Sequence, residues 1–277
     1  MTRYICETCG TQFAETDAPP PRCPICEEPR QYIGHRGQRW TTLEEVRAGH
    51  DNVFRPQEDG LLGIGTLPSF GIGQRALLVR TPEGNVLWDC IALLDEPTET
   101  MVRALGGVDV IAVSHPHYYT TMVEWAHAFG ATVHLHAADR QWVMRDDPAI
   151  RYWEGGTLPL FGGITLINAG GHFDGGTVLH WPGGGGGRGA LLSGDILQVV
   201  QDRRWVSFMY SYPNIVPLPA WDVERLVATI EPYGFDRLYG AFWPSVVASD
   251  GKAAARRSAE RYVAALNRPR PEPVGGA

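Results

Sequence analysis

The sequence predicts an α+β protein, a sandwich with helices on its outside, preceded by a small four-cysteine unit. Short apolar runs rich in β-branched residues alternate with turn residues and with segments of helical periodicity. Their order runs from antiparallel strands through mixed strand–helix units and back to strands, which favours packed layers. Four of the five cysteines stand in two CxxC pairs near the N-terminus. These observations define the two parts of the chain.

The net charge of −7 and the absence of a run of Lys and Arg argue against nucleic acid as a partner. No apolar stretch approaches the roughly 20 residues that a membrane span needs. The N-terminus "MTRYICETCG" has no apolar signal core. We therefore expect a cytoplasmic protein without a membrane partner. In that reducing compartment, paired cysteines more often bind metal than form disulfides.

The two cysteine pairs are the most specific motif of the chain. "CETC" contains Cys6 and Cys9, "CPIC" contains Cys23 and Cys26, and thirteen residues separate the pairs. Two such turns can bring four thiolates around one ion. The polar, Pro-rich segment between them is too small to build a core, so a metal would hold it together. Two disulfides or four free thiols are the alternatives. Four ligands would close the shell, which predicts a structural or electron-transferring site.

The segment "YICETCG … RCPICEEPRQYI" resembles the rubredoxin-like domain, or zinc ribbon. Rubredoxins hold iron in this frame and zinc ribbons hold zinc, and tetrahedral thiolate sites suit both metals. The resemblance therefore implies zinc or iron here. We place the small domain at residues 1–38 and the main domain at residues 39–277. Zinc ribbons often lie at subunit contacts, which keeps a homodimer open as an alternative.

The main domain begins with a short helix over 41–50 and a Gly-rich loop over 60–74. The runs "RALLVR" and "VLWDCIALL" predict a hairpin across "TPEGN", and "VDVIAV" predicts a strand. Thr121 and Glu124 form the pattern of a capping box that opens a helix, and Gly130 is expected to end it.

A strand over 131–138 and a helix over 138–146 follow. The run "ITLINA" predicts a strand before the loop "GGHFDGG". "TVLHWP" and "GALLSGD" predict a hairpin whose flexible tip is the glycine run at 183–189. No "GK[ST]" follows that run, which argues against a phosphate loop. Helices over 221–234 and 252–266 and a last strand over 236–243 complete the chain.

Polar residues gather where the predicted strands end. His115 and His117 follow one strand, His172 follows a second, and Asp195 ends a third. Loops at strand ends can converge on one point. Three imidazoles and a carboxylate from three strand ends can bind one cation. The sequence therefore predicts a metal site of these four residues, with the alternative that Asp195 stands just outside the ligand shell.

These residues resemble the metallo-β-lactamase superfamily, over roughly residues 60–266. The resemblance implies a four-layer αββα sandwich with the metal site at one edge. The family motif is His-x-His-x-Asp-His, followed by a histidine, a bridging aspartate and a last histidine. His115 and His117 match the first two positions, His172 the third histidine and Asp195 the bridging aspartate.

The second metal site of the family is depleted in this chain. Tyr119 stands where the family aspartate stands, Thr120 stands where its histidine stands, and no histidine follows His180. The resemblance thus implies one metal, Zn²⁺ with Fe²⁺ as the alternative. A phenol, with an unperturbed pKa of about 10, is a poor base near neutral pH. We expect Tyr118 or Tyr119 to donate a hydrogen bond to a developing oxyanion instead.

The segment after Asp195 is dense in aromatic residues. It includes Trp205, Phe208, Tyr210 and Tyr212. They are expected to form a substrate wall or lid over the metal, or alternatively to pack a long loop onto the sandwich.

Three functions are consistent with these features. The first is a mononuclear metal-dependent hydrolase of a small ester, thioester, lactone or amide, in which the metal lowers the pKa of a bound water. The second is a mononuclear non-haem iron oxygenase or redox protein, similar to the persulfide dioxygenases of the superfamily, with the four-cysteine domain as electron donor. The third is a metal-stabilised scaffold without catalysis.

Overall fold

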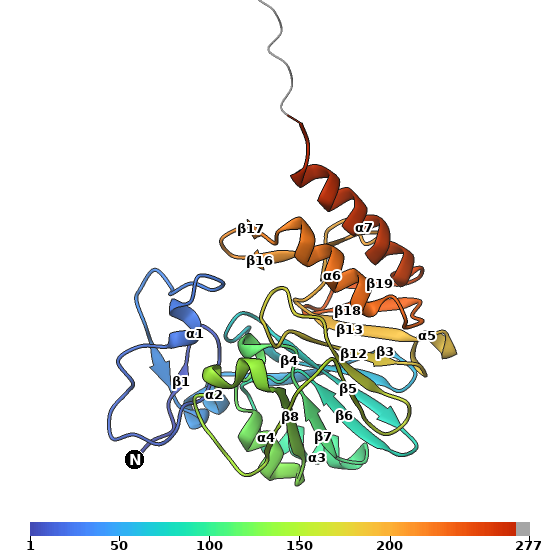
Figure 1. Cartoon of the computed structure of the whole chain (residues 1–277). Helices are drawn as coiled ribbons and strands as arrows, with labels where there is room; N and C mark the ends of the chain where they lie inside the picture. The colour runs from blue at the N-terminus through green and yellow to red at the C-terminus, as the bar shows by residue number, and fades with distance from the viewer. Residues whose placement is uncertain (270–277) are drawn as a thin grey trace, which may run out of the picture.

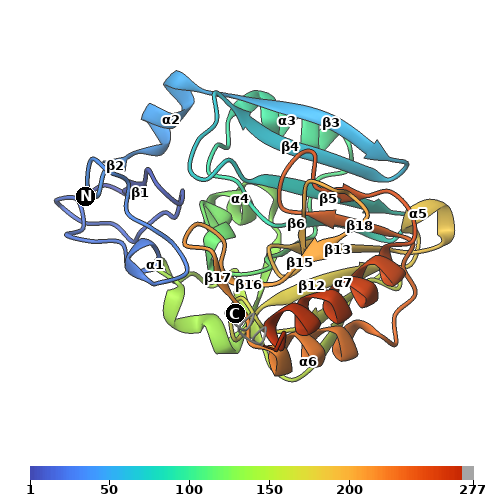
Figure 2. The ribbon, with the colours of Figure 1, turned by 90° about the horizontal axis from the view of Figure 1, so that it is seen from above.

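The computed structural model describes residues 1–269. A small N-terminal unit lies beside a body of four stacked layers, helices on sheet on sheet on helices (Figure 1). Helices α6 and α7 cover one outer face, and α3 and α4 cover the other. The αββα arrangement implied by the resemblance is confirmed. Seen from above, the four-cysteine unit flanks the end of the sandwich (Figure 2).

The seven-stranded sheet runs in the order β3 to β9, antiparallel from β3 to β6 and parallel from β6 to β9. Its strands are β3 (Asp51–Glu58), β4 (Leu61–Leu67), β5 (Arg75–Thr81), β6 (Gly84–Trp88), β7 (Val110–Ala112), β8 (Thr132–His136) and β9 (Ile150–Trp153).

The six-stranded sheet has the order β10-β11-β12-β13-β18-β19, and only β13 and β18 run parallel. Its strands are β10 (Thr157–Pro159), β11 (Thr165–Asn168), β12 (Thr177–Trp181), β13 (Ala190–Gly194), β18 (Arg237–Gly240) and β19 (Val246–Val247). Two short ribbons stand apart: β14 (Gln198–Val199) with β15 (Val206–Ser207), and β16 (Met209–Ser211) with β17 (Val216–Pro217).

The helices that cover the sheets are amphipathic. They are α3 (Glu96–Ala104), α4 (Met122–Phe129), α6 (Ala220–Ile230) and α7 (Gly251–Leu266). Short helical turns connect the other elements: α1 (Pro24–Glu27), α2 (Leu43–Gly49), α5 (Gly184–Gly187), η1 (Pro116–Tyr118) and η2 (Ala137–Trp142). No helix within residues 1–269 combines the length and the apolar character that crossing a membrane requires.

Strand alternation sorts the apolar side chains into three cores, one between each pair of layers. On β5, Leu78 faces the core under α3 and α4, and Leu77 faces the core between the sheets. On β13, Leu192 faces the inter-sheet core, and Leu191 faces the core under α6 and α7. Because successive side chains on a strand point to opposite faces, both faces of each sheet are apolar and covered.

The structure corrects the expected loop at 60–74. Residues 61–67 form strand β4, whose glycines have a packing role. A Cβ at Gly63 or at Gly65 would stand 2.6 Å from a ring atom of Trp243. The indole of Trp243 therefore packs directly against the backbone of β4, and only glycine at these two positions leaves room for it. Glycine here reflects the close approach of a side chain 180 residues away in the chain.

Three further expectations were wrong in detail. Thr121 makes no capping hydrogen bond, because its hydroxyl donates to the carbonyls of Ile91 and Ala92 instead. The helix expected over 138–146 is the 3₁₀ turn η2. The second hairpin strand ends at Trp88, and the remaining apolar residues pack as loop. Gly130 does end α4 in the left-handed conformation, as expected.

In the small unit, β1 (Ile5–Cys6) pairs with β2 (Trp40–Thr41). This two-stranded sheet joins the first residues of the chain to those that lead into α2. Helix α2 opens with a complete capping box between Thr42 and Glu45. The cysteines pack with Ile25, Phe13 and Trp40 in a separate small core.

Candidate metal centre and the cavity beside it

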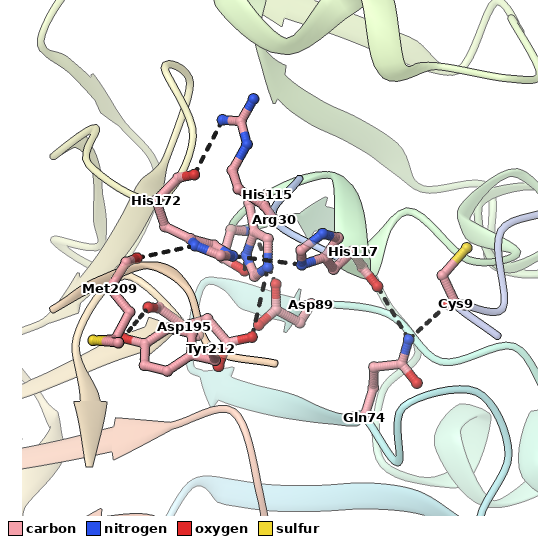
Figure 3. A network of polar contacts seen from close by, with 12 residues as sticks. Cys9, Arg30, Gln74, Asp89, His115, His117, His172, Asp195, Met209 and Tyr212 are labelled. Atoms are coloured by element: carbon pink, nitrogen blue, oxygen red, sulfur yellow. Dashed lines mark hydrogen bonds and ion pairs between the residues drawn. The ribbon is translucent and has the colours of Figure 1, made fainter. Parts of the chain in front are cut away.

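Three strand ends deliver the four predicted ligands to one place. His115 lies just before the turn η1 and His117 lies within it, and this turn follows β7. His172 lies in the loop between β11 and β12, and Asp195 directly follows β13. Strand β7 belongs to one sheet, and β11 and β13 belong to the other, and the residues that follow all three strands meet at a common edge of the sandwich. Their side chains cluster there (Figure 3).

The four side chains are close enough to share one ion. Their ligand atoms all lie within 4.8 Å of one another. His172 Nε2 is 3.5 Å from His117 Nδ1, and His115 Nε2 is 3.7 Å from Asp195 Oδ2. Each of these residues is at most 6% exposed.

Hydrogen bonds to the far ring nitrogens set the orientation of two histidines. His172 Nδ1 donates to the carbonyl of Tyr210 (2.8 Å), so its Nε2 keeps a free lone pair. His115 Nδ1 lies 2.8 Å from the hydroxyl of Ser114, which leaves Nε2 directed at the cluster. Partners of this kind fix the tautomer and ring orientation of metal-ligating histidines.

Burial keeps the imidazoles neutral. It lowers the pKa of His115 and His117 well below the usual value, with the other histidines adding to the effect. It lowers the pKa of His172 to about 4. Neutral imidazole is the form that binds a metal. Burial raises the pKa of Asp195 to about 7, because the buried carboxylate has no cation beside it in the protein.

The site passes a test of fit to a cation. His115 Nε2 and Asp195 Oδ1 are fully buried, and neither has a hydrogen-bond partner among the described residues. His117 faces the cluster with its Nδ1, which lies 3.5 Å from His172 Nε2. Unpartnered buried polar atoms are costly and call for an explanation. Three nitrogen donors and one carboxylate suit Zn²⁺ and Fe²⁺, so a single divalent ion accounts for this donor set.

Asp89 holds the backbone directly before His115 in place, and the sequence analysis did not identify it. It follows β6 with a φ of 60°, a conformation that strains a non-glycine residue. Its Oδ1 accepts the backbone N–H of Ser114 at 2.8 Å. Burial raises the pKa of Asp89 to about 7. The only signal in the sequence was an aspartate at the end of an apolar strand.

The residues in place of the second-site ligands point elsewhere. Tyr119 is buried, and burial raises the pKa of its hydroxyl well above the usual value, with Asp139 adding to the effect. Thr120 accepts the backbone N–H of Gln12, so the four-cysteine unit packs against this segment. Tyr118 is fully buried with an unpartnered hydroxyl, and its ring centroid is 5.2 Å from that of His115. Neither tyrosine lines the cavity beside the metal site.

A cavity of about 260 Å³ opens onto the candidate ligands. His117, His172 and Asp195 form its floor. The other lining residues are uncharged: Gln31, Tyr32, Ser69, Gly71, Ile72, Tyr212, Pro213 and Phe242. Two of them, Gln31 and Tyr32, come from the four-cysteine part of the chain. The cavity is smaller than the roughly 300–1,000 Å³ typical of ligand sites.

Only one of the four expected wall aromatics lines this cavity. Tyr212 does, and its hydroxyl donates to the carbonyl of Asp195 (2.9 Å). Trp205 instead stacks on α7, with the guanidinium of Arg261 3.8 Å from its ring. Phe208 is fully buried in the core under α6 and α7. Tyr210 stands behind the site, where its hydroxyl donates to Glu28 (3.1 Å).

The four cysteines form a second candidate metal centre. Cys6 and Cys26 have their sulfurs 3.6 Å apart, and Cys9 and Cys23 have theirs 3.8 Å apart. These separations exceed a disulfide bond of about 2.05 Å. They match the roughly 3.8 Å edges of a tetrahedron with metal–sulfur bonds of about 2.3 Å. All four are buried, and the side chain of Gln38 donates to Cys6 Sγ. The donor set fits zinc or iron.

Gln74 connects the two centres. Its Nε2 donates to the carbonyl of Cys9 (2.7 Å) and to the carbonyl of His117 (3.0 Å), as Figure 3 shows. A side chain at the start of β5 therefore holds one cysteine turn and one histidine turn at a fixed separation. The side chain is 6% exposed, so water competes little for these bonds.

No family model matches the chain, but a relative of known sequence places it in a family. A protein of Bacillus subtilis (strain 168), described as the uncharacterized protein YmaE, is 50% identical over 269 residues, which are 96% of this chain and 98% of YmaE.

Solved structures share the fold at low sequence identity. The DIM-1 metallo-β-lactamase is 14% identical with a TM-score of 0.58, covering 78% of this chain and 99% of its own. The mono-zinc form of the FIM-1 metallo-β-lactamase from Pseudomonas aeruginosa is 12% identical with a TM-score of 0.56, covering 76% and 95%. The chemotaxis sensor ODP, in a peroxy diiron state, is 16% identical with a TM-score of 0.53, covering 77% and 94%. The chain has the metallo-β-lactamase fold joined to a four-cysteine unit, and it belongs to the same family as YmaE.

Proposed function

We propose that the protein is a mononuclear metal-dependent hydrolase of a small, uncharged ester, thioester, lactone or amide. One observation carries this proposal: three neutral imidazoles and one carboxylate meet, buried and partly unpartnered, at the floor of a small cavity. His115, His117, His172 and Asp195 would hold the ion. When bound, such an ion lowers the pKa of a water and polarises a carbonyl.

Asp195 has the position for proton transfer. Asp195 lines the cavity, its Oδ2 lies 3.7 Å from His115 Nε2, and its Oδ1 has no hydrogen-bond partner among the described residues. Oδ1 can accept the proton of the attacking water as the water oxygen bonds to the carbonyl carbon. The same proton then passes to the leaving oxygen, sulfur or nitrogen as its bond to that carbon breaks. Tyr212 keeps the backbone of Asp195 in place.

The walls of the cavity favour a neutral substrate. Among the described residues that line it, none is a lysine or arginine, and Asp195 is the only carboxylate. Away from the ion, a negatively charged group of a substrate would therefore meet no positive side chain on the cavity wall, at a cost in desolvation. This supports carbonyl hydrolysis over phosphodiester hydrolysis. The one candidate ion in place of a two-metal site supports the same choice.

Redox chemistry at an iron centre is the second candidate. The observation that favours it is the link through Gln74, which places the two candidate centres two hydrogen bonds apart. With iron in both sites, the four-cysteine centre would supply electrons to the histidine centre. This candidate also keeps the four predicted ligands in their roles.

Metal analysis and hydrolysis assays test the choice. Protein purified without added metal is analysed for zinc and iron, and then assayed with neutral nitrophenyl esters, thioesters and lactones. The hydrolase predicts two equivalents of zinc and no visible colour. It also predicts a turnover that Asp195→Asn lowers by at least 10²-fold while the three histidines retain the zinc of this site. Iron with thiolate absorption that bleaches on reduction, and no hydrolysis, would shift the function to redox chemistry.

A further inference from the structure

Gln31 is a buried polar side chain with no partner, and it lines the cavity at the candidate metal site. The residue is 4% exposed. Its Oε1 is buried without a hydrogen bond among the described residues. The lining of the same cavity includes the apolar residues Ile72, Pro213 and Phe242. A carboxamide with two donors and an acceptor is costly to leave unsatisfied in such surroundings.

The backbone on either side of Gln31 is firmly held. Asn214 Nδ2 donates to the carbonyls of Pro29 (2.9 Å) and Gln31 (3.0 Å). Ser211 Oγ donates to the carbonyl of Arg30 (3.2 Å). These hydrogen bonds hold three successive carbonyls, so the unpaired carboxamide of Gln31 is not the result of a loose loop.

Arg30 anchors the same segment to the metal site. Its guanidinium donates to the carbonyl of His172 (3.1 Å) and lies 3.9 Å from the centre of the Phe173 ring. It also pairs with Glu28 at 2.8 Å. Through Arg30 the four-cysteine unit thus binds the loop that carries His172, and the next residue, Gln31, lines the cavity.

We propose that Gln31 is a substrate-binding residue, and that it selects a small neutral carbonyl compound carrying a second polar group, of the amide or carbonyl kind, away from the reacting carbonyl. This inference rests on the proposed function and names the class of substrate for that site. A ligand group that pairs with the carboxamide removes an unsatisfied buried polar group, so the free protein bears a cost that binding relieves. The four-cysteine unit is then part of the substrate site.

The test compares two hydroxamic acids, which carry a metal-binding head and need no turnover. Hexanohydroxamic acid has an apolar tail, and 4-carbamoylbutanohydroxamic acid has a tail of similar length that ends in an amide. Their dissociation constants are measured by calorimetry on the metal-loaded protein. We expect the carbamoyl compound to bind roughly 2- to 12-fold more tightly, the factor that one net hydrogen bond gives.

Gln31→Met keeps the length of the side chain and removes its hydrogen-bonding groups. It should abolish the preference for the carbamoyl compound. The matched control is Gln201→Met, at an exposed glutamine outside the cavity, which should leave the preference unchanged. Thermal unfolding separates binding from structure: Gln31→Met should unfold at the same temperature as the wild type or higher, because an unsatisfied buried group is removed.

Each outcome bears on the proposal. No preference in the wild type, no binding of either compound, or a preference that survives Gln31→Met overturns it. A lower unfolding temperature for Gln31→Met overturns it as well, since that result assigns the side chain a structural role. If the preference is present and lost on substitution while no ester, thioester or lactone is hydrolysed, Gln31 remains a ligand-binding residue and only the hydrolase function fails.

Discussion

Replacing Gln74 by methionine should destabilise the whole protein, because this side chain is the hydrogen-bond donor that the structure shows for the carbonyls of Cys9 and His117. Methionine has a similar length and no N–H. Both carbonyls would be left buried without their partner, at about 1–3 kcal/mol each. The free energy of unfolding should therefore fall by about 2–6 kcal/mol.

Urea unfolding measures this loss. The far-ultraviolet circular dichroism and the fluorescence of the nine tryptophans give two independent transitions. Free zinc is buffered at one concentration, because a metal that binds the folded state raises apparent stability by mass action. The control is Gln31→Met, a buried glutamine of the same length whose side chain makes no hydrogen bond among the described residues. It should unfold at or above the wild-type midpoint.

The comparison of the two variants refutes or supports the reasoning directly. If Gln74→Met unfolds at the wild-type midpoint, the two hydrogen bonds make no net contribution to the free energy of unfolding, and the reasoning is refuted. If both variants fall by the same amount, the loss comes from replacing any buried glutamine. A fall confined to Gln74→Met, with the slope of the transition unchanged, agrees with the bonds seen in the structure.

The remaining predictions concern the metals and the buried carboxyls. His115→Ala and His172→Ala should each lose one equivalent of metal by elemental analysis and keep the metal of the cysteine site; full metal content in both would contradict the assignment. Cys23→Ser should release the metal of the four-cysteine site. It should also raise the KM for a neutral ester more than it lowers kcat, because Gln31 and Tyr32 would no longer be held in the cavity wall. An unchanged KM would show that the four-cysteine unit does not contribute to substrate binding. Burial raises the pKa of Asp139 to about 7. The contribution of this carboxyl to stability is therefore fully present below pH about 4 and is lost as the pH rises through 7. The stability of Asp139→Asn relative to the wild type should accordingly increase between pH 4 and 8, by up to about 4 kcal/mol in urea unfolding. A difference that does not depend on pH would show that the carboxyl is not buried in solution.

Local patterns in the sequence carried the prediction of the fold and of the ligand residues. The CxxC spacing is a property of a single turn, and the alternation of apolar residues is a property of a single strand. His115, His117, His172 and Asp195 each follow an apolar run, and loops at strand ends can converge on one point. These relations are readable without knowing which strands are neighbours.

Other features depend on contacts between distant parts of the chain. Gly63 and Gly65 looked like loop residues because nothing nearby in sequence indicates that Trp243 lies across them. Trp205 and Phe208 were expected near the metal because they follow Asp195, but α7 and its core offer them a larger apolar surface.

The sequence by itself predicted a sandwich with helices on its outside and the two candidate ligand sets, because these follow from local alternation, from the CxxC spacing and from polar residues at strand ends. The four layers and the depleted second metal site were implications of the resemblance to the metallo-β-lactamase superfamily. Only the tertiary structure decided that the four-cysteine unit closes the cavity. Gln31, Gln74 and Arg30 meet partners from 43 to 183 residues away. Such contacts come from packing two units against each other, and no local periodicity records them.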